Sequence, residues 1–218
     1  MKTLFTTNRK IDLLTALILS IFIITFAICF TVFFKQLYYF DIDYLNITDY
    51  VSLSKETIKH NYDILIQYQS IFYKGDLLLP DFIMSETGRI HFIEVKHIFE
   101  LVQYICLTTG FLSLLLCVKN IKQKEYRFLK LTSIISIGLP SIIGMLAFAN
   151  FDQAFIIFHK IFFNNDYWIF DERYDPVIRI LPQDFFMHCF ILIIAVIILL
   201  SFICFFIYKK KQKEIIQA

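Results

Sequence analysis

Two histidines, His91 and His159, are the side chains of this sequence best placed to carry out chemistry. Each lies at the edge of a long apolar segment, His91 shortly before one and His159 shortly after another. Imidazole has an unperturbed pKa of about 6.5, so a histidine can take up and release a proton near neutral pH. A shared site for the two rings would supply a general base and a general acid, and separate structural roles are the alternative.

The segment Phe158–Trp168 surrounds His159 with phenylalanines, two asparagines, an acid and the only tryptophan of the chain. It is too polar to cross a bilayer, and tryptophan and tyrosine favour the membrane–water interface. Residues 154–163, which Asn150 or Asp152 would cap, predict a short interfacial helix that carries His159. We therefore expect the chemistry of this protein at a membrane surface.

The other candidates for chemistry indicate packing. His60 is interpreted as a solvated residue, and His97 and His188 as interfacial packing residues. All five cysteines lie inside apolar segments, where cysteine packs as a small hydrophobe, so neither disulfides nor a thiol nucleophile are expected. The sequence contains no glycine-rich phosphate loop, no Gly-x-Ser-x-Gly elbow, no His-Glu-x-x-His motif and no basic patch for nucleic acid.

The elements that must position the histidines belong to a membrane protein. Hydrophobic residues make up 58% of the chain, which is typical of a polytopic membrane protein rather than of a soluble domain. A helix of about 20 apolar residues crosses the hydrocarbon core, and the segments that reach this length are 11–34, 98–118, 128–149 and 185–208. The first is too long for a signal peptide and no cleavage site follows it, so it is interpreted as a retained anchor.

Charge is distributed unevenly between the connections. The N-terminal residues, the short loop 119–127 and the tail 209–218 are basic, whereas loops 35–97 and 150–184 are acidic on balance. Because basic segments stay on the cytoplasmic side, we expect both termini inside the cell and both long loops outside. Both candidate histidines then share the outer face of the membrane.

The long loops predict a small cap. Residues 54–69 show the apolar periodicity of a helix, and Asp175-Pro176 resembles the start of another. The apolar segments 82–84 and 89–92 flank Ser85–Gly88, which predicts a β-hairpin. The expected fold class is therefore an all-α membrane protein with four transmembrane helices and a small mixed α/β extracellular cap.

At the level of these residues, two other functions stay open. His91, Glu94 and His159 together would suit a metal-dependent membrane hydrolase, since zinc accepts histidine and carboxylate ligands. A non-enzymatic four-span protein whose outer loops recognise a partner is the second alternative. The expectation is a site without a metal or another cofactor.

Two blocks of residues resemble the lipoprotein intramolecular transacylase (Lit) family of Gram-positive bacteria. The segment His91–Lys96 reads His-Phe-Ile-Glu-Val-Lys, close to the family pattern His-Met-x-Asp-Val-Lys. The second block is Phe158–Trp168, followed by Asp175, Leu181-Pro182 and Phe185-Phe186. Phe92 and Glu94 depart from the pattern, although the acid is kept with one more methylene. The four-span plan also agrees, so the resemblance covers essentially the whole chain.

The resemblance implies a membrane enzyme with two catalytic histidines, here His91 and His159. The family moves the sn-2 acyl chain of a diacylglyceryl-cysteine lipoprotein to the α-amino group of its N-terminal cysteine, which gives a lyso-form lipoprotein. The implied partners are diacylated bacterial lipoproteins and membrane lipid, and the implied location is the bacterial plasma membrane. A monomer that needs no cofactor and binds no nucleic acid is expected.

The resemblance, taken with the chemistry of aminolysis, assigns roles to individual residues. Attack of an amine on an ester needs a base for the amine proton and an acid or oxyanion donor at the ester. His159 is assigned to the first role and His91 to the second, with the reverse left open. Glu94 or Lys96 would orient His91. The other supporting residues, which would shape the pocket or simply fold the cap, are Asn165, Trp168 and Asp175.

Overall fold

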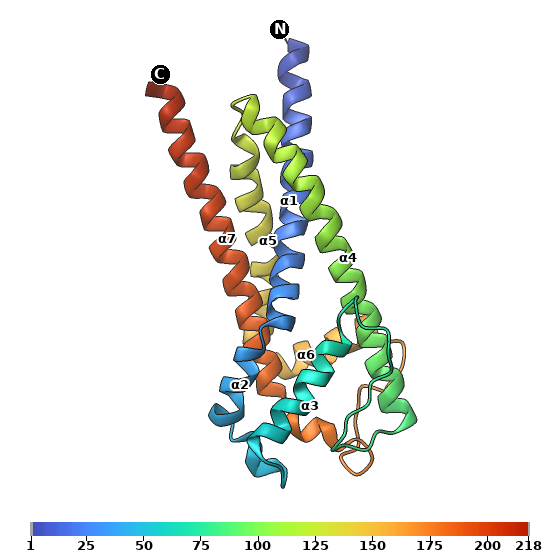
Figure 1. Ribbon diagram of the computed structural model, residues 1–218. Helices are drawn as coiled ribbons and strands as arrows, with labels where there is room; N and C mark the ends of the chain where they lie inside the picture. The colour runs from blue at the N-terminus through green and yellow to red at the C-terminus, as the bar shows by residue number, and fades with distance from the viewer. Residues whose placement is uncertain (1, 218) are drawn as a thin grey trace. The chain divides into compact units, whose positions relative to one another are not determined.

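The computed structural model describes residues 2–217, and all regular secondary structure in that range is helical (Figure 1). In chain order the elements, with η for a 3-10 helix, are α1 (Lys2–Phe33), α2 (Lys35–Tyr44), η1 (Ile47–Tyr50), α3 (Lys55–Tyr68), α4 (Glu86–Lys122), α5 (Arg127–Ala149), α6 (Phe151–Phe162), η2 (Pro176–Ile180) and α7 (Gln183–Gln217). The predicted all-α membrane class is confirmed. The predicted mixed α/β cap is wrong, because no strand occurs among the described residues.

The segment predicted as a β-hairpin is instead irregular chain followed by the first turns of α4. The Ser85 hydroxyl accepts a hydrogen bond from the Gly88 N–H at 3.0 Å, which is the bond that an N-cap residue makes. Glu86 places an acid in the first turn, where the positive end of the helix dipole favours it. The residues interpreted as a hairpin loop therefore start a helix.

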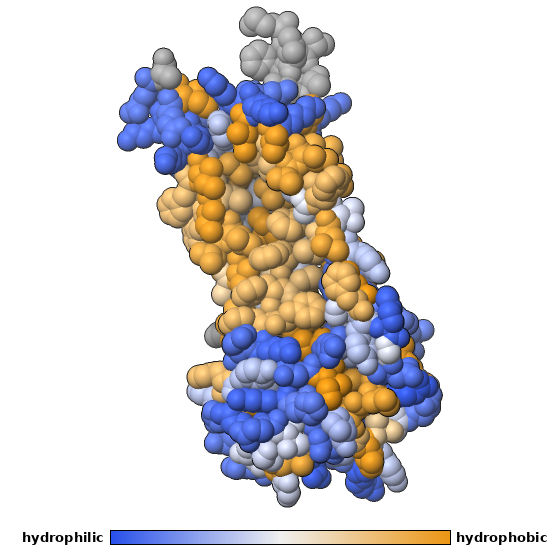
Figure 2. Space-filling model, viewed as in Figure 1, coloured by the Kyte–Doolittle hydropathy of each residue, from blue (hydrophilic) through white to orange (hydrophobic). Residues whose placement is uncertain are grey.

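Among the described residues, four helices are long and apolar enough to cross a membrane. These candidate spans are Arg9–Phe33, Glu86–Lys122, Arg127–Met145 and Gln183–Gln217. Large hydrophobic side chains such as Phe111 on α4 and Phe206 on α7 are exposed on them, and Figure 2 shows hydrophobic residues over most of the visible surface of the long helices. Such a surface is stable in lipid rather than in water, so the protein is a multi-pass membrane protein.

The chain divides into two compact units. The first consists of the residues up to Ile28, Gln103–Met145 and the residues from Leu192 onward. Within it, the hydroxyls of Ser136 on α5 and Ser201 on α7 are hydrogen-bonded at 2.7 Å, and Asn120 Nδ2 donates to Thr15 Oγ1 at 3.0 Å. Such polar contacts hold helices together in lipid, where burial of apolar side chains gives little advantage.

The second unit consists of Cys29–Val102 and Leu146–Ile191 and contains the residues of both resemblance blocks. Its core is formed around Tyr38, whose hydroxyl donates to the Ile180 carbonyl at 2.6 Å and whose ring stacks on Tyr62 with centroids 3.7 Å apart. The predicted helix over 54–69 is confirmed as α3, with the Ser54 side chain as its N-cap. Its buried apolar side chains are Ile58, Tyr62, Leu65, Ile66 and Tyr68.

Candidate active site

His91 lies in the second turn of α4, and a residue far along the chain fixes the start of this helix. The buried carboxylate of Asp175 accepts hydrogen bonds from the Ser85 N–H at 2.7 Å and the Ser85 hydroxyl at 2.6 Å. Gly88 lies so close to this carboxylate that a Cβ atom there would overlap with Asp175 Oδ1. Only glycine permits this approach of backbone to side chain. Asp175 therefore positions the helix that carries His91 and does not itself touch the ring.

His159 lies in the last turn of α6, whose N-cap is Asn150, one of the two residues proposed for this role. The Nδ1 atom of His159 is 2.7 Å from the backbone carbonyl oxygen of Phe155, one turn earlier in the helix. A carbonyl oxygen can only accept, so this bond assigns the proton to Nδ1 and leaves the lone pair on Nε2. The ring is therefore held in the tautomer that can take up a proton through Nε2.

The structure brings the two candidate histidines together inside an aromatic pocket. The ring centroids of His91 and His159 are 6.0 Å apart, and the residues are only 6% and 9% exposed. Phe163 packs against both rings, at 4.7 Å from His91 and 5.6 Å from His159. Trp168 stacks on His159 at 4.7 Å, and Phe170 meets His91 edge-on at 5.5 Å. Two imidazoles thus share one small, largely dry site.

Burial lowers the pKa of His159 below the ordinary 6.5, because the pocket strips water from the imidazolium form. The hydrogen bond to the Phe155 carbonyl opposes this shift, since it favours a protonated ring, but burial is the larger effect. His159 is therefore neutral at physiological pH. That is the protonation state that a general base requires.

Polar atoms without partners lie in the same region. Asn165 Nδ2 donates to Glu94 Oε1 at 2.8 Å and so joins the segment after α6 to α4. Three other atoms, Glu94 Oε2, His91 Nδ1 and Trp168 Nε1, are buried and have no hydrogen-bond partner among the described residues. Because buried polar atoms are nearly always bonded in native proteins, this group indicates a site for a polar ligand.

Lys96, proposed as a residue that orients His91, makes its contacts elsewhere. Its ammonium donates to the carbonyl oxygens of Tyr68 at 2.5 Å and Tyr73 at 3.0 Å. Its Nζ atom also lies 3.8 Å from Glu100 Oε1, an ion pair across one turn of α4. Lys96 therefore ties the connection between α3 and α4 to α4.

Three contributors to the site, Ser85, Gly88 and Phe170, were missed in the sequence. Ser85 and Gly88 were assigned to a turn, although a serine three residues before the bonded N–H also fits an N-cap. Phe170 packs on His91 and also stacks on Phe92 at 5.5 Å. No signal marked Phe170, because an aromatic residue in a loop has no periodicity that shows what it touches.

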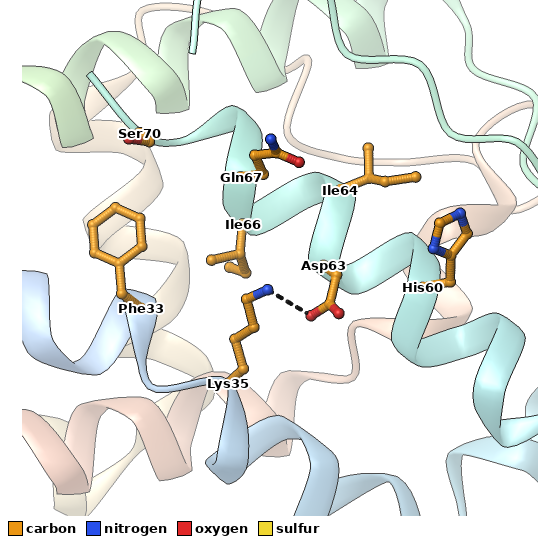
Figure 3. Close-up of a pocket in the computed structure, with 8 residues that line it drawn as sticks. All are labelled: Phe33, Lys35, His60, Asp63, Ile64, Ile66, Gln67 and Ser70. Carbon is orange, nitrogen blue, oxygen red and sulfur yellow. Dashed lines mark ion pairs between the residues drawn. The ribbon is translucent and has the colours of Figure 1, made fainter. Parts of the chain in front are cut away.

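In the described part of the chain, the histidine pair coincides neither with a possible metal site nor with the hollow found beside α3. No group of three or more histidine, cysteine, aspartate or glutamate side chains in the described part of the chain is arranged to hold a metal ion. A cavity of about 480 Å³ lies between α3 and the end of α1 (Figure 3), and its lining includes Lys35 and Asp63, which form an ion pair at 2.9 Å. Asp63 also accepts from the Tyr39 hydroxyl at 2.6 Å, so these polar groups are already paired.

The fold and the site together define a multi-pass membrane protein with the groups for acid–base chemistry in a buried aromatic pocket. Residues 13–186 match the family description "Lipoprotein intramolecular transacylase Lit". The solved structure of the membrane-integral lipoprotein intramolecular transacylase Lit from Bacillus cereus is similar over 98% of this chain and 99% of that chain, with 38% identity and a TM-score of 0.95. A comparison with curated proteins gives no match.

Two variants of the Bacillus cereus protein are similar as well. One carries a histidine-to-arginine substitution and aligns with 38% identity over 98% of this chain and 96% of that chain, with a TM-score of 0.88. The other carries a histidine-to-alanine substitution and aligns with 37% identity over the full length of both chains, with a TM-score of 0.90. The chain belongs to the lipoprotein intramolecular transacylase (Lit) family. It is accordingly a membrane-integral transferase.

Proposed function

We propose that the His91–His159 pair catalyses transfer of the sn-2 acyl chain of a diacylglyceryl-cysteine lipoprotein to the α-amino group of the same cysteine. The observation that carries this proposal is the fixed tautomer of His159, whose Nδ1 is bonded to Phe155 and whose Nε2 is free to accept a proton. The second imidazole, His91, lies 6.0 Å away and has an unpartnered nitrogen. One ring acts on the amine and the other on the ester.

In this reaction His159 Nε2 takes a proton from the α-amino group as its nitrogen attacks the ester carbonyl carbon. His91 donates a hydrogen bond to the oxygen on which negative charge develops. The carbon–nitrogen bond forms, the carbon–oxygen bond to glycerol breaks, and the imidazolium of His159 returns its proton to the glycerol oxygen. An ester is exchanged for an amide, so atoms and charge balance without a cofactor.

The protein needs no nucleophile of its own, because amine and ester belong to one substrate molecule. Holding two such groups in contact is worth an effective concentration of about 10⁵ M or more in favourable geometries. The five cysteines occur in the long helices α1, α4 and α7. The pocket therefore serves to orient the substrate, exclude water and transfer a proton.

The supporting residues receive distinct roles. Asp175 positions the start of α4 through Ser85, and Lys96 ties the loop before α4 to that helix. Trp168 holds the plane of His159 by stacking. Asn165 links the segment after α6 to Glu94. The Trp168 contact acts on a catalytic ring directly, whereas the other contacts fix the helix and the segments around the pair.

Location follows from the charge pattern of the sequence. The basic N-terminal residues, loop 119–127 and tail 209–218 favour the cytoplasmic side of the plasma membrane. The second unit then faces the outer surface, where a lipoprotein keeps its acyl chains in the leaflet and its peptide in water. Phe158, Ile161 and Phe162 on α6 are exposed and apolar, which suits contact with membrane lipid. We propose that the protein acts there as a monomer.

The test is mass spectrometry of the N-terminal peptide of a reporter lipoprotein, made in a bacterial host that produces only diacylglyceryl lipoproteins. The expected result is a peptide of unchanged total mass in which one acyl chain has moved to the amine. Loss of one chain in mass would instead identify a lipoprotein hydrolase. An unchanged peptide, with the protein inserted normally, would contradict enzymatic action and favour a partner-binding role.

A further inference from the structure

One carboxylate oxygen of Glu94 accepts a hydrogen bond, and the other has no partner among the described residues. Glu94 Oε1 accepts from Asn165 Nδ2 at 2.8 Å, whereas Oε2 is buried without a partner among the described residues. Glu94 follows His91 by three residues on α4, so both side chains lie on the same face of the helix. Through Asn165, Glu94 is also joined to the segment whose Phe163 and Trp168 pack on the imidazoles.

The asparagine that holds Glu94 is itself fixed in orientation. Asn165 Oδ1 accepts from the Tyr167 N–H at 3.0 Å, which leaves its amide group as the donor toward Glu94. Asn165 also lies between His159 and Trp168 in the sequence and thus belongs to the segment that closes the pocket. The position of Glu94 is consequently fixed by the segment after α6, which also carries Trp168, the residue stacked on His159.

In the described part of the chain, no cationic side chain compensates this carboxylate. None of the ion pairs there includes Glu94. The nearest lysine in sequence, Lys96, donates to two carbonyl oxygens and pairs with Glu100. Glu94 is half-buried, and its enclosed Oε2 atom is costly without a hydrogen-bond partner unless a ligand supplies one.

We propose that Glu94 Oε2 is the receptor for the α-ammonium group of the substrate's N-terminal cysteine. This inference rests on the proposed function and names the residue that recognises the attacking group. The ammonium loses one proton to solvent before transfer. In the neutral amine that remains, one N–H donates to Glu94 and another faces His159 Nε2, while the nitrogen lone pair is left for attack on the ester. The unpartnered Trp168 Nε1 is only a donor, so it suits an oxygen of the substrate and cannot compete for the ammonium.

Recognition of this kind distinguishes substrate from product. Before transfer the substrate carries a cationic amine, which forms a charge-assisted hydrogen bond with a carboxylate. After transfer the nitrogen is a neutral amide that has lost this attraction. Lipoproteins whose N-terminus is already acylated should therefore bind weakly, and the product should leave the pocket.

The experiment uses a synthetic cysteinyl peptide with two ether-linked alkyl chains on its glyceryl group, because an ether cannot transfer an acyl chain. Binding of the free-amine and the N-acetylated peptide is measured to wild-type protein and to Glu94→Gln in lipid nanodiscs. The substituted side chain keeps an oxygen for Asn165 but presents an amide donor to the ammonium. The matched control is Glu86→Gln, which removes the same charge from the exposed first turn of the same helix.

Wild type and the Glu86→Gln control should prefer the free-amine peptide by about tenfold to a hundredfold, the value of one charge-assisted hydrogen bond. Glu94→Gln should lose this preference while its melting temperature stays within a few degrees of wild type. An equal preference in Glu94→Gln and wild type would overturn the inference. Turnover of the ester-linked peptide by wild type is measured in parallel, so failure of the amine site and failure of the transacylase assignment are recorded separately.

Discussion

Two histidines of the second unit, the half-buried His188 and the buried His159, are bonded to different kinds of partner. His188 Nδ1 lies 2.8 Å from a carboxylate oxygen of Asp41, a fully buried residue on α2. His159 Nδ1 is bonded only to a backbone carbonyl, and its neighbour is a second imidazole. An imidazole beside a carboxylate is an electrostatic tie between helices, whereas two imidazoles with free nitrogens suit proton transfer. The comparison supports the proposal that the His91–His159 pair carries the chemistry and that His188 serves packing.

The partner of His188 also illustrates how the environment determines protonation. Burial raises the pKa of Asp41 above its ordinary value, and the hydrogen bond from His188 opposes this shift. At His159 no acid offsets the burial, so the pKa of the ring falls. The same fold thus contains a histidine with a counter-charge and a histidine without one.

The first prediction concerns His91→Ala, for which a large loss of acyl-transfer rate is expected. The variant removes the group that stabilises charge on the ester oxygen, and loss of one such donor reduces kcat by about 10² to 10³. Acyl transfer to the reporter peptide in nanodiscs, timed by mass spectrometry, checks it. A variant that retains more than half of the wild-type rate would show that His91 is not part of the site.

A smaller effect is expected where the helix that carries His91 is fixed. Gly88→Ala forces the Asp175 carboxylate or the start of α4 to move, since the new methyl group would overlap with Oδ1. We expect roughly a tenfold loss of kcat, typical of a small misplacement of a catalytic group. The control is Gly138→Ala on α5, where a Cβ would meet nothing within 4 Å. Equal activity in both variants would contradict a positioning role for Asp175.

His188→Ala should affect stability. The change leaves the buried Asp41 carboxylate without its hydrogen bond, which costs about 1–3 kcal/mol of the free energy of unfolding. Thermal unfolding in detergent, beside His60→Ala at an exposed position on α3, measures the difference. A melting temperature equal to that of the His60 variant would show that the pair does not contribute to packing.

The smallest expected effect is a pH dependence of stability from His159. Its folded-state pKa lies below the ordinary 6.5, so below about pH 6.5 the unfolded chain binds protons before the folded protein does. Stability from this residue is therefore present at neutral pH and is lost as the pH falls through that window. Melting temperatures across about pH 5.5 to 7.5 should fall less toward acid in His159→Gln than in wild type. A melting temperature that falls more steeply toward acid pH in the variant than in wild type would contradict a lowered pKa of His159.

Much of the helical framework could be predicted, because its signals are local. Apolar length marked the spans, and the periodicity of Ile58, Tyr62 and Leu65 marked the buried face of α3. The positions of His91 and His159 beside apolar segments left both a shared site and separate structural roles open, and the family resemblance favoured the shared site. These inferences need only the chain neighbours of each residue.

The remaining features depend on contacts between distant segments. Ser85–Gly88 starts a helix because Asp175, 90 residues later, accepts from Ser85; without that partner the same four residues are equally suitable for a turn. The packing of Phe170 on His91 likewise depends on the path by which the loop after α6 comes back to α4. The tautomer of His159 depends on a backbone carbonyl one turn earlier in its own helix, which the pattern of side chains does not show. No local pattern of side chains encodes such contacts, which is why the hairpin prediction failed.

The most direct test compares His159→Ala with His188→Ala in a single-turnover measurement of acyl transfer, using purified protein in nanodiscs and a diacylglyceryl-cysteine peptide. Loss of the base should slow transfer in His159→Ala by about 10² to 10⁴, whereas folded His188→Ala should react at close to the wild-type rate. Equal rates in the two variants would contradict the assignment of proton transfer to the His91–His159 pair.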